Sequence, residues 1–368
     1  MKTKFTRLSY LILAAFPLIF SFQNCGRSSF AVDPKLAPDG TVVSSFLPSA
    51  GVPILPAVPP VDLGKLITDS VFAPTSFWYT PVPIDAPTHP DSAAMVQDFI
   101  TQRNTYFNSV GINTTSYSSP VFYVDAATPL VKVMQWDCQN KGYLDSTLAT
   151  MWAQVPIPPN AMASAGSDME MSVYQPSTDT LWEFWKMQKN ASGVWEGCWG
   201  GRLQNVSKAQ GQFTGSFGTT ATSLSFIGGQ VTAEELSRGE IRHAIGIAMV
   251  NLAARSIYSW PAHRSDGNGR GITPEGLRFR LDPNLDIDSL QIHPVAKIIA
   301  KAGQKYGFVV WDTAGAVSMR MQNVISYTAL GQPNPYPALF NGTPNYAILN
   351  GIPWDRLQFL PMNYGKPL

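Results

Sequence analysis

A carboxylate and a tryptophan are predicted to share one face of a strand. From Thr180 to Gln188 the side chains alternate, so that Glu183 and Trp185 point to the same side. A tryptophan ring can cover the apolar face of a sugar, and a neighbouring carboxylate can accept hydroxyls or transfer a proton. Apolar surroundings would raise the pKa of Glu183, as a general acid requires. The alternative is a glutamate on the solvent face of a strand whose neighbours form the core.

Asp168 and Asp312 are the candidates for a second catalytic carboxylate. In a glycosidase, Glu183 would be the proton donor and one of these aspartates its partner. A carboxyl separation near about 5.5 Å would imply retention of configuration, and about 6.5–9.5 Å inversion. A lyase with His243 as its base is the other enzymatic form that we consider.

His243 enters an apolar segment directly after a predicted helical turn at residues 233–238. One interpretation is a general base or substrate ligand, since histidine titrates near neutral pH. The other is a buried histidine whose ring is satisfied by a backbone carbonyl.

A polar, glycine-rich loop spans residues 263–271 and precedes a predicted strand. Glycines let a backbone approach a ligand closely, so His263 and Asp266 are candidate substrate-binding residues together with Trp185. A plain surface loop explains the same composition.

No metal or cofactor is expected from the motifs. Asp282, Asn284, Asp286 and Asp288 recur at every second position, as at the start of a calcium loop, but Ile287 replaces the required glycine. A turn before the following helix explains this run more simply. The chain has no phosphate-binding loop, dinucleotide fingerprint, serine-hydrolase elbow or zinc-protease motif, which argues against nucleotide use and these hydrolase classes.

The first residues have the pattern of an export signal. Lys2, Lys4 and Arg7 precede an apolar run from Leu11 to Phe22, which is too short to span a membrane comfortably. The run ends before Cys25 in a segment that resembles the bacterial lipobox, although Gln23 and Asn24 stand where small residues are usual. An ordinary secretory signal followed by an incidental cysteine is the alternative.

The lipobox resemblance implies a signal peptide over residues 1–24 and a lipid, such as palmitate, on Cys25. Acyl chains would anchor the protein stably in the membrane of the cell envelope. Because no aspartate follows Cys25, lipoprotein sorting suggests the outer membrane. Residues 25–69 are rich in proline and serine and are predicted to form a tether, followed by one globular domain over residues 70–368.

The composition fits a β-rich exported protein. Charged residues make up 14%, aromatic residues 11%, and there are ten tryptophans. Without the three basic residues of the predicted signal, 23 lysines and arginines face 25 acidic residues. This charge near −2 does not favour binding to nucleic acid.

Acylation of Cys25 would leave Cys138 and Cys198 as an even pair. In an oxidising compartment we expect them to form a disulfide, with two separate buried thiols as the alternative.

Helical spacing predicts helices over residues 91–106 and 294–306, the latter followed by Gly307 at the C-terminal cap position. The strand 308–312 comes next. Alternation over 169–174, 180–188 and 194–202, separated by turns, predicts a three-stranded meander. Further strands are expected at 121–125, 131–137, 244–250 and 277–281. Together these elements predict a mainly antiparallel β-sandwich or jelly roll with two or three peripheral helices.

The segment from Ser76 to Pro361 resembles a family of exported bacterial proteins that have no assigned activity. This resemblance implies one large exported domain and supplies no reaction. The blocks that carry it are residues 76–78, 182–185, 239–244, 265–267, 274–278, 306–307 and 311–312.

Two functions remain open. One is an envelope-anchored, carbohydrate-active enzyme, either a polysaccharide hydrolase or a lyase, whose partners are the membrane and a polysaccharide. The other is a non-catalytic envelope lipoprotein that acts as a glycan-binding, adhesive or structural module. The first predicts that Glu183, His243 and Asp312 face one open cleft.

Overall fold

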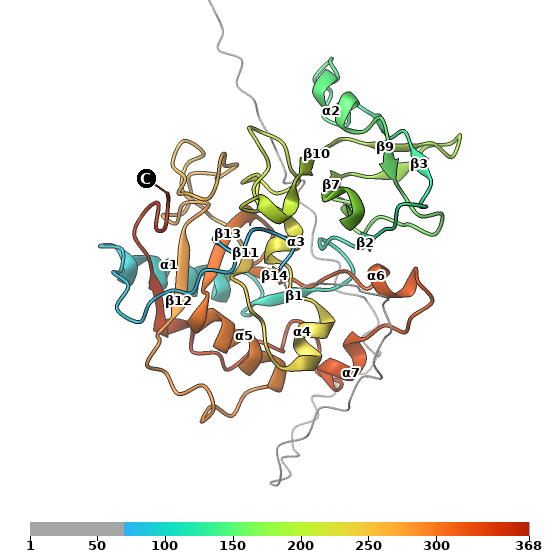
Figure 1. The fold of residues 1–368 in the computed structure, drawn as a ribbon. Helices are drawn as coiled ribbons and strands as arrows, with labels where there is room; N and C mark the ends of the chain where they lie inside the picture. Colours follow the sequence, from blue (N-terminus) through green and yellow to red (C-terminus); the bar gives the residue numbers. More distant parts are fainter. Residues whose placement is uncertain (1–69, 368) are drawn as a thin grey trace, which may run out of the picture.

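The computed structural model describes residues 70–367. The signal peptide, Cys25 and the tether that the sequence predicts lie outside the described residues. Within them, Figure 1 shows a large sheet with helices around it and a group of smaller sheets beside α2.

The large sheet has six strands and mixes directions. β11 pairs in parallel with β13 and antiparallel with β14, β1 is parallel to β14, and β12 is antiparallel to both β13 and β15. In spatial order the strands are β1 (Gly111–Asn113), β14 (Ser318–Arg320), β11 (Ile245–Met249), β13 (Phe308–Thr313), β12 (Arg278–Leu281) and β15 (Leu357–Phe359).

Helices cover one face of this sheet through the main apolar core. Ile247 and Val310 of the sheet belong to the same buried cluster as Ile299 of α5 and Phe99 of α1. The helices that contribute to this core are α1 (Ser92–Thr105), α4 (Ala233–Arg238), α5 (Pro294–Lys305), α6 (Ile325–Thr328) and α7 (Tyr336–Phe340).

The predicted helix at 294–306 is confirmed as α5. Pro294 occupies the first turn, where it sacrifices no helical hydrogen bond, and the His293 side chain caps the start by accepting from Val295 N at 3.1 Å. Gly307 follows the helix with a φ of +77°, a conformation that glycine adopts without strain. The strand after it is confirmed as β13.

The other face of the large sheet meets a second sheet, with Leu181 and Tyr174 packed in one cluster with Val309 and Trp311. Three of its strands form the predicted antiparallel meander, and the fourth adds in parallel. Its order is β10 (Trp199–Gln204), β7 (Thr180–Trp185), β6 (Met171–Gln175) and β2 (Val121–Tyr123).

Short elements complete the described chain. The two-stranded sheet is β3 (Leu130–Val131) and β5 (Val155–Pro156), and the three-stranded one is β4 (Met134–Gln135), β9 (Trp195–Gly197) and β8 (Gln188–Lys189). The remaining helices are α2 (Ser146–Met151) and α3 (Phe226–Gly229), with 3-10 turns at Pro176–Thr178, Val206–Lys208 and Trp354–Arg356.

The predicted β framework is present, but the description as a mainly antiparallel sandwich or jelly roll with few helices is too simple. Residues 70–367 contain seven α-helices, and the largest sheet is mixed. Five of these helices have only four to six residues, so each is too short to show helical periodicity in the sequence.

A bulge in β13 turns Asp312 toward the second sheet. Ile247 pairs with Val310, but the next residue, Ala248, pairs with Asp312, so that Trp311 is the extra residue. Because side chains alternate along a strand, this insertion places Asp312 on the face of Ala248 instead of the helix-covered face of Val310.

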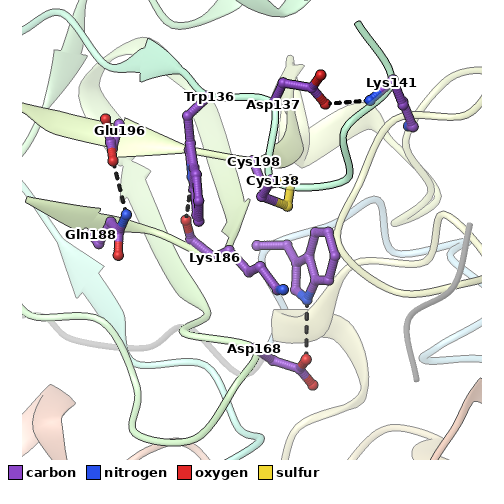
Figure 2. Close-up of a disulfide and its surroundings, with 10 residues drawn as sticks. Trp136, Asp137, Cys138, Lys141, Asp168, Lys186, Gln188, Glu196 and Cys198 are labelled. Atoms are coloured by element: carbon purple, nitrogen blue, oxygen red, sulfur yellow. Dashed lines mark hydrogen bonds between the residues drawn. A yellow bond between two sulfur atoms is a disulfide. The ribbon is translucent and has the colours of Figure 1, made fainter. Parts of the chain in front are cut away.

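The disulfide between Cys138 and Cys198 is confirmed, with a Cα–Cα distance of 5.6 Å. It joins the segment after β4 to the junction between β9 and β10 (Figure 2). The bridge therefore joins two chain segments that are 60 residues apart in the sequence.

Replacing both cysteines with serine is expected to lower the free energy of unfolding by about 4 kcal/mol, because an open chain has more conformational entropy when unfolded. Urea unfolding of the oxidised wild type and of the double variant measures the difference. Coincident unfolding curves would show that the bridge does not stabilise the fold.

Candidate functional site

Glu183 lies inside the protein with both carboxylate oxygens occupied. It is 0% exposed on β7. Its Oε1 accepts from Ser225 Oγ at 2.6 Å and from Ile227 N at 3.4 Å, and its Oε2 accepts from Thr219 Oγ1 at 3.0 Å. Burial raises the pKa of Glu183 to about 7 despite these donors. This geometry is that of a structural carboxylate that ties segment 219–227 to the sheet.

His243 forms a separate buried pair with Glu235. Its Nδ1 lies 2.8 Å from the backbone oxygen of Ala244, and its Nε2 lies 3.2 Å from Glu235 Oε1. Both ring nitrogens face oxygen acceptors, so this geometry fits a protonated imidazole. Burial opposes ionisation of Glu235, but His243 and the hydrogen bonds from Thr232 together outweigh it and lower the pKa of that carboxyl. The pair borders a small cavity with Tyr79.

Glu183, His243 and Asp312 therefore do not meet in one cleft, contrary to the enzymatic arrangement expected from the sequence. All three are buried, and each has its own set of hydrogen-bond partners. The reason is that β7 is covered on both of its faces, including the face that carries Glu183.

A different group of acidic residues gathers around Arg320 of β14. Arg320 Nη2 lies 2.9 Å from Asp312 Oδ2, and its Nη1 lies 3.3 Å from Glu170 Oε1. The guanidinium is only 4% exposed and lies over the rings of Phe226 and Trp311. Asp312 and Glu170 thus share one buried cation, although Asp312 lies in the large sheet and Glu170 directly precedes β6 of the second sheet.

Asp266 and Glu275 extend this group on the side of the glycine-rich loop. Both Asp266 oxygens accept from Thr313 Oγ1 at 2.9 Å, and Asp266 N donates to Glu275 Oε2 at 2.9 Å. One oxygen each from Asp266, Glu275 and Asp312 lies within 4.8 Å of the others. The loop candidate Asp266 and the strand candidate Asp312 are therefore brought together.

Asp168 is the half-buried member of the group. Its Oδ1 accepts from Trp185 Nε1 at 3.2 Å, so the predicted ligand-stacking tryptophan instead uses its ring nitrogen to orient this aspartate. Figure 2 shows Asp168 and Lys186 close to the disulfide. Trp185 itself is 5% exposed, and the Lys186 ammonium lies 4.9 Å from its ring centroid.

His263 is exposed at the start of the loop, and its Nδ1 lies 2.9 Å from the backbone oxygen of Phe213. Its neighbour Arg264 donates to the carbonyls of Gly218 and Thr220 and to Ser223 Oγ. These contacts fasten the loop to segment 213–223. His263 has no contact with the carboxylates among the interactions of the described residues.

Burial raises the pKa of every carboxyl in the group. For Glu170 it reaches about 7, with burial as the main cause and the negative charge of Asp168 adding to it. Burial also raises the pKa of Asp266, Glu275 and Asp312, and their mutual repulsion contributes for the last two. For Asp168 burial again outweighs the attraction of Arg320. The carboxyls of this group therefore take up protons at higher pH than ordinary carboxyls do, most of all Glu170, Glu275 and Asp312.

Sequence reasoning missed Glu170, Glu275 and Arg320. Glu275 stands in one of the blocks that carry the family resemblance, and Glu170 lies within the predicted strand at 169–174. No local pattern marks Arg320, whose partners Glu170 and Asp312 are 150 and 8 residues away.

A shallow pocket beside the disulfide is a second candidate site. Trp136 and Trp199 line it together with Asp137, Lys141 and the half-exposed Tyr143. The Lys141 ammonium lies 5.0 Å from the Trp199 ring centroid. Aromatic and charged groups at one surface are suited to contact with a sugar.

No protein family, curated protein or solved structure matches this chain. No helix within residues 70–367 is long and apolar enough to cross a membrane.

Replacing Glu183 with glutamine is expected to change how stability depends on pH. The pKa of Glu183 is about 7 in the folded protein and near 4.5 when unfolded, so the wild type loses stability as pH rises between these values. The loss reaches at most about 3 kcal/mol, and the glutamine variant does not share it. Urea unfolding at pH 4.5, 6 and 8 should show that the free energy of unfolding of the variant rises relative to that of the wild type as the pH increases. A difference that stays constant with pH would contradict the raised pKa of Glu183.

Proposed function

We propose that this chain is a lipoprotein of the cell envelope with a carbohydrate-active centre at Asp168, Glu170, Asp266, Glu275 and Asp312. The observation that carries the proposal is the gathering of these carboxyls around Arg320, with half-buried Asp168 at their edge. Glycoside cleavage needs a carboxyl that gives up a proton and a second carboxylate that supports the attack on the sugar.

Asp168 is the group proposed to act as the general acid. It is the most exposed carboxyl of the five, and Trp185 Nε1 holds its orientation. Its raised pKa keeps a proton available at higher pH than an ordinary aspartate would. In hydrolysis, this proton passes to the glycosidic oxygen as the bond to the sugar carbon breaks, and water adds to that carbon while one of its protons passes to a carboxylate of the group.

The predicted lipobox supports a location in the cell envelope. Because no aspartate follows Cys25, lipoprotein sorting supports the outer membrane. The disulfide is consistent with export, because such bonds persist in oxidising compartments.

Asp168→Asn is expected to lower polysaccharide turnover at least about 100-fold, because the amide cannot donate a proton as an acid does. A panel of neutral and acidic polysaccharides, assayed for new reducing ends and for unsaturated products, measures hydrolysis and elimination separately. Asp125→Asn, a surface change in the second sheet's neighbourhood, is the matched control and should keep full turnover. Absence of turnover by the wild type on the whole panel would overturn the enzymatic proposal.

The alternative function is a glycan-binding module that uses the pocket beside the disulfide. The observation that favours it is the grouping of Trp136, Tyr143 and Trp199 at this pocket, while most of the carboxyl group is buried. Binding on a glycan array without turnover would favour this function over the enzyme.

Cys25→Ser is expected to abolish incorporation of labelled palmitate and to release the protein from the membrane fraction, because the lipidated residue is lost. Radiolabelling in the producing bacterium followed by fractionation measures both effects, and Cys138→Ser serves as the control that keeps the label. Label retained in Cys25→Ser would contradict lipidation at this residue.

A further inference from the structure

Three carboxylates from separate segments converge behind the glycine-rich loop. Asp266 belongs to the loop, Glu275 precedes β12, and Asp312 lies on β13 after the bulge. One oxygen from each lies within 4.8 Å of the other two. Two oxygens that bind one calcium ion at about 2.3–2.6 Å can be at most roughly 5 Å apart, so this spacing is compatible with a shared ion.

Two of these side chains keep an unpartnered oxygen in the interior. Asp312 uses Oδ2 for Arg320, and Glu275 uses Oε2 for the Asp266 amide, whereas Asp312 Oδ1 and Glu275 Oε1 have no hydrogen-bond partner. Asp312 is 3% exposed and Glu275 1%. Buried carboxylate oxygens without a donor are costly, and here two occur in one cluster.

The surrounding charge also calls for a further cation. Electrostatic contact joins five carboxyls, those of Asp168, Glu170, Asp266, Glu275 and Asp312, to two guanidiniums in the interior, Arg264 and Arg320, and to Lys186 and Arg255 at the edge of the group. If all five ionise, their charges outnumber those of Arg264 and Arg320 by three, and Lys186 and Arg255 offset part of this excess. A divalent ion would remove most of this excess, and oxygen ligands are those that calcium prefers.

We propose that Asp266, Glu275 and Asp312 bind one calcium ion. The ion would link the loop at Asp266 to β13, and its remaining coordination positions would take further oxygens, since calcium accepts about 6–8. Asp266, at 9% exposure, is the ligand nearest to solvent.

The aspartate-rich run in the sequence has other roles. Asp282 pairs with Arg356 and accepts from Asn284 N, Asp286 accepts from Asp288 N, and Asp288 pairs with Lys301 at 2.7 Å. Asp282 and Asp288 thus have cations, and no oxygen of these three carboxylates is buried without a partner, in contrast to Asp312 Oδ1 and Glu275 Oε1. Asp288 therefore provides a control position.

The test is direct calcium binding by the purified full-length chain. After EDTA treatment and its removal, isothermal titration with CaCl₂ should give one ion per chain, and saturating calcium should raise the melting temperature by on the order of 5 °C. Glu275→Gln and Asp312→Asn should each abolish the titration signal and the thermal shift, while Asp288→Asn should keep both.

The proposal fails if the wild type binds no calcium, if it binds only Mg²⁺ or Mn²⁺ in parallel titrations, or if Asp288→Asn alone removes binding. The wild-type titration decides even if both cluster variants fail to fold. This inference does not depend on the proposed carbohydrate activity: a protein that binds calcium and cleaves no polysaccharide keeps the ion site and loses only that function.

Discussion

The packing of the two main sheets depends on the ion pairs of the buried Arg320 guanidinium. Arg320 projects from the large sheet and contacts Asp312 within it, while Glu170, at the start of the second sheet, approaches from 150 residues away. Burying a charge is expensive unless partners surround it, and removing one partner leaves the others uncompensated. Phe226 and Trp311 add ring faces to the same cation. The junction between the sheets is therefore also the place where ionisable groups concentrate.

The bulge at Trp311 connects this electrostatic centre to backbone geometry. The ring of this extra tryptophan needs space, which Gly246 and Gly229 leave because they have no Cβ. A Cβ would lie 2.3 Å from the Trp311 ring at Gly246 and 2.5 Å from it at Gly229. In a regular strand, the Asp312 side chain would point into the apolar core under the helices instead of toward the second sheet. Two glycines and one inserted tryptophan thus determine that a carboxylate faces Arg320.

The sequence predicts local elements well and the site only in part. The helix α5, the strand β13, the meander and the pair Cys138–Cys198 follow from periodicity, capping residues and cysteine count. Alternation also shows which residues share a face of β7, but not that segment 219–227 covers Glu183. The pairing of Arg320 with Glu170 depends on long-range packing, for which a single sequence holds no signal.

Two buried acidic centres in the same molecule are satisfied in different ways, and the difference separates structure from function. Glu183 has neutral donors on both oxygens, so the fold itself meets its needs whether or not it is ionised. Asp312 and Glu275, in contrast, each keep one carboxylate oxygen that has no hydrogen-bond donor. Protons or a bound cation must therefore compensate these oxygens. A centre that exchanges protons or cations with its surroundings can take part in chemistry.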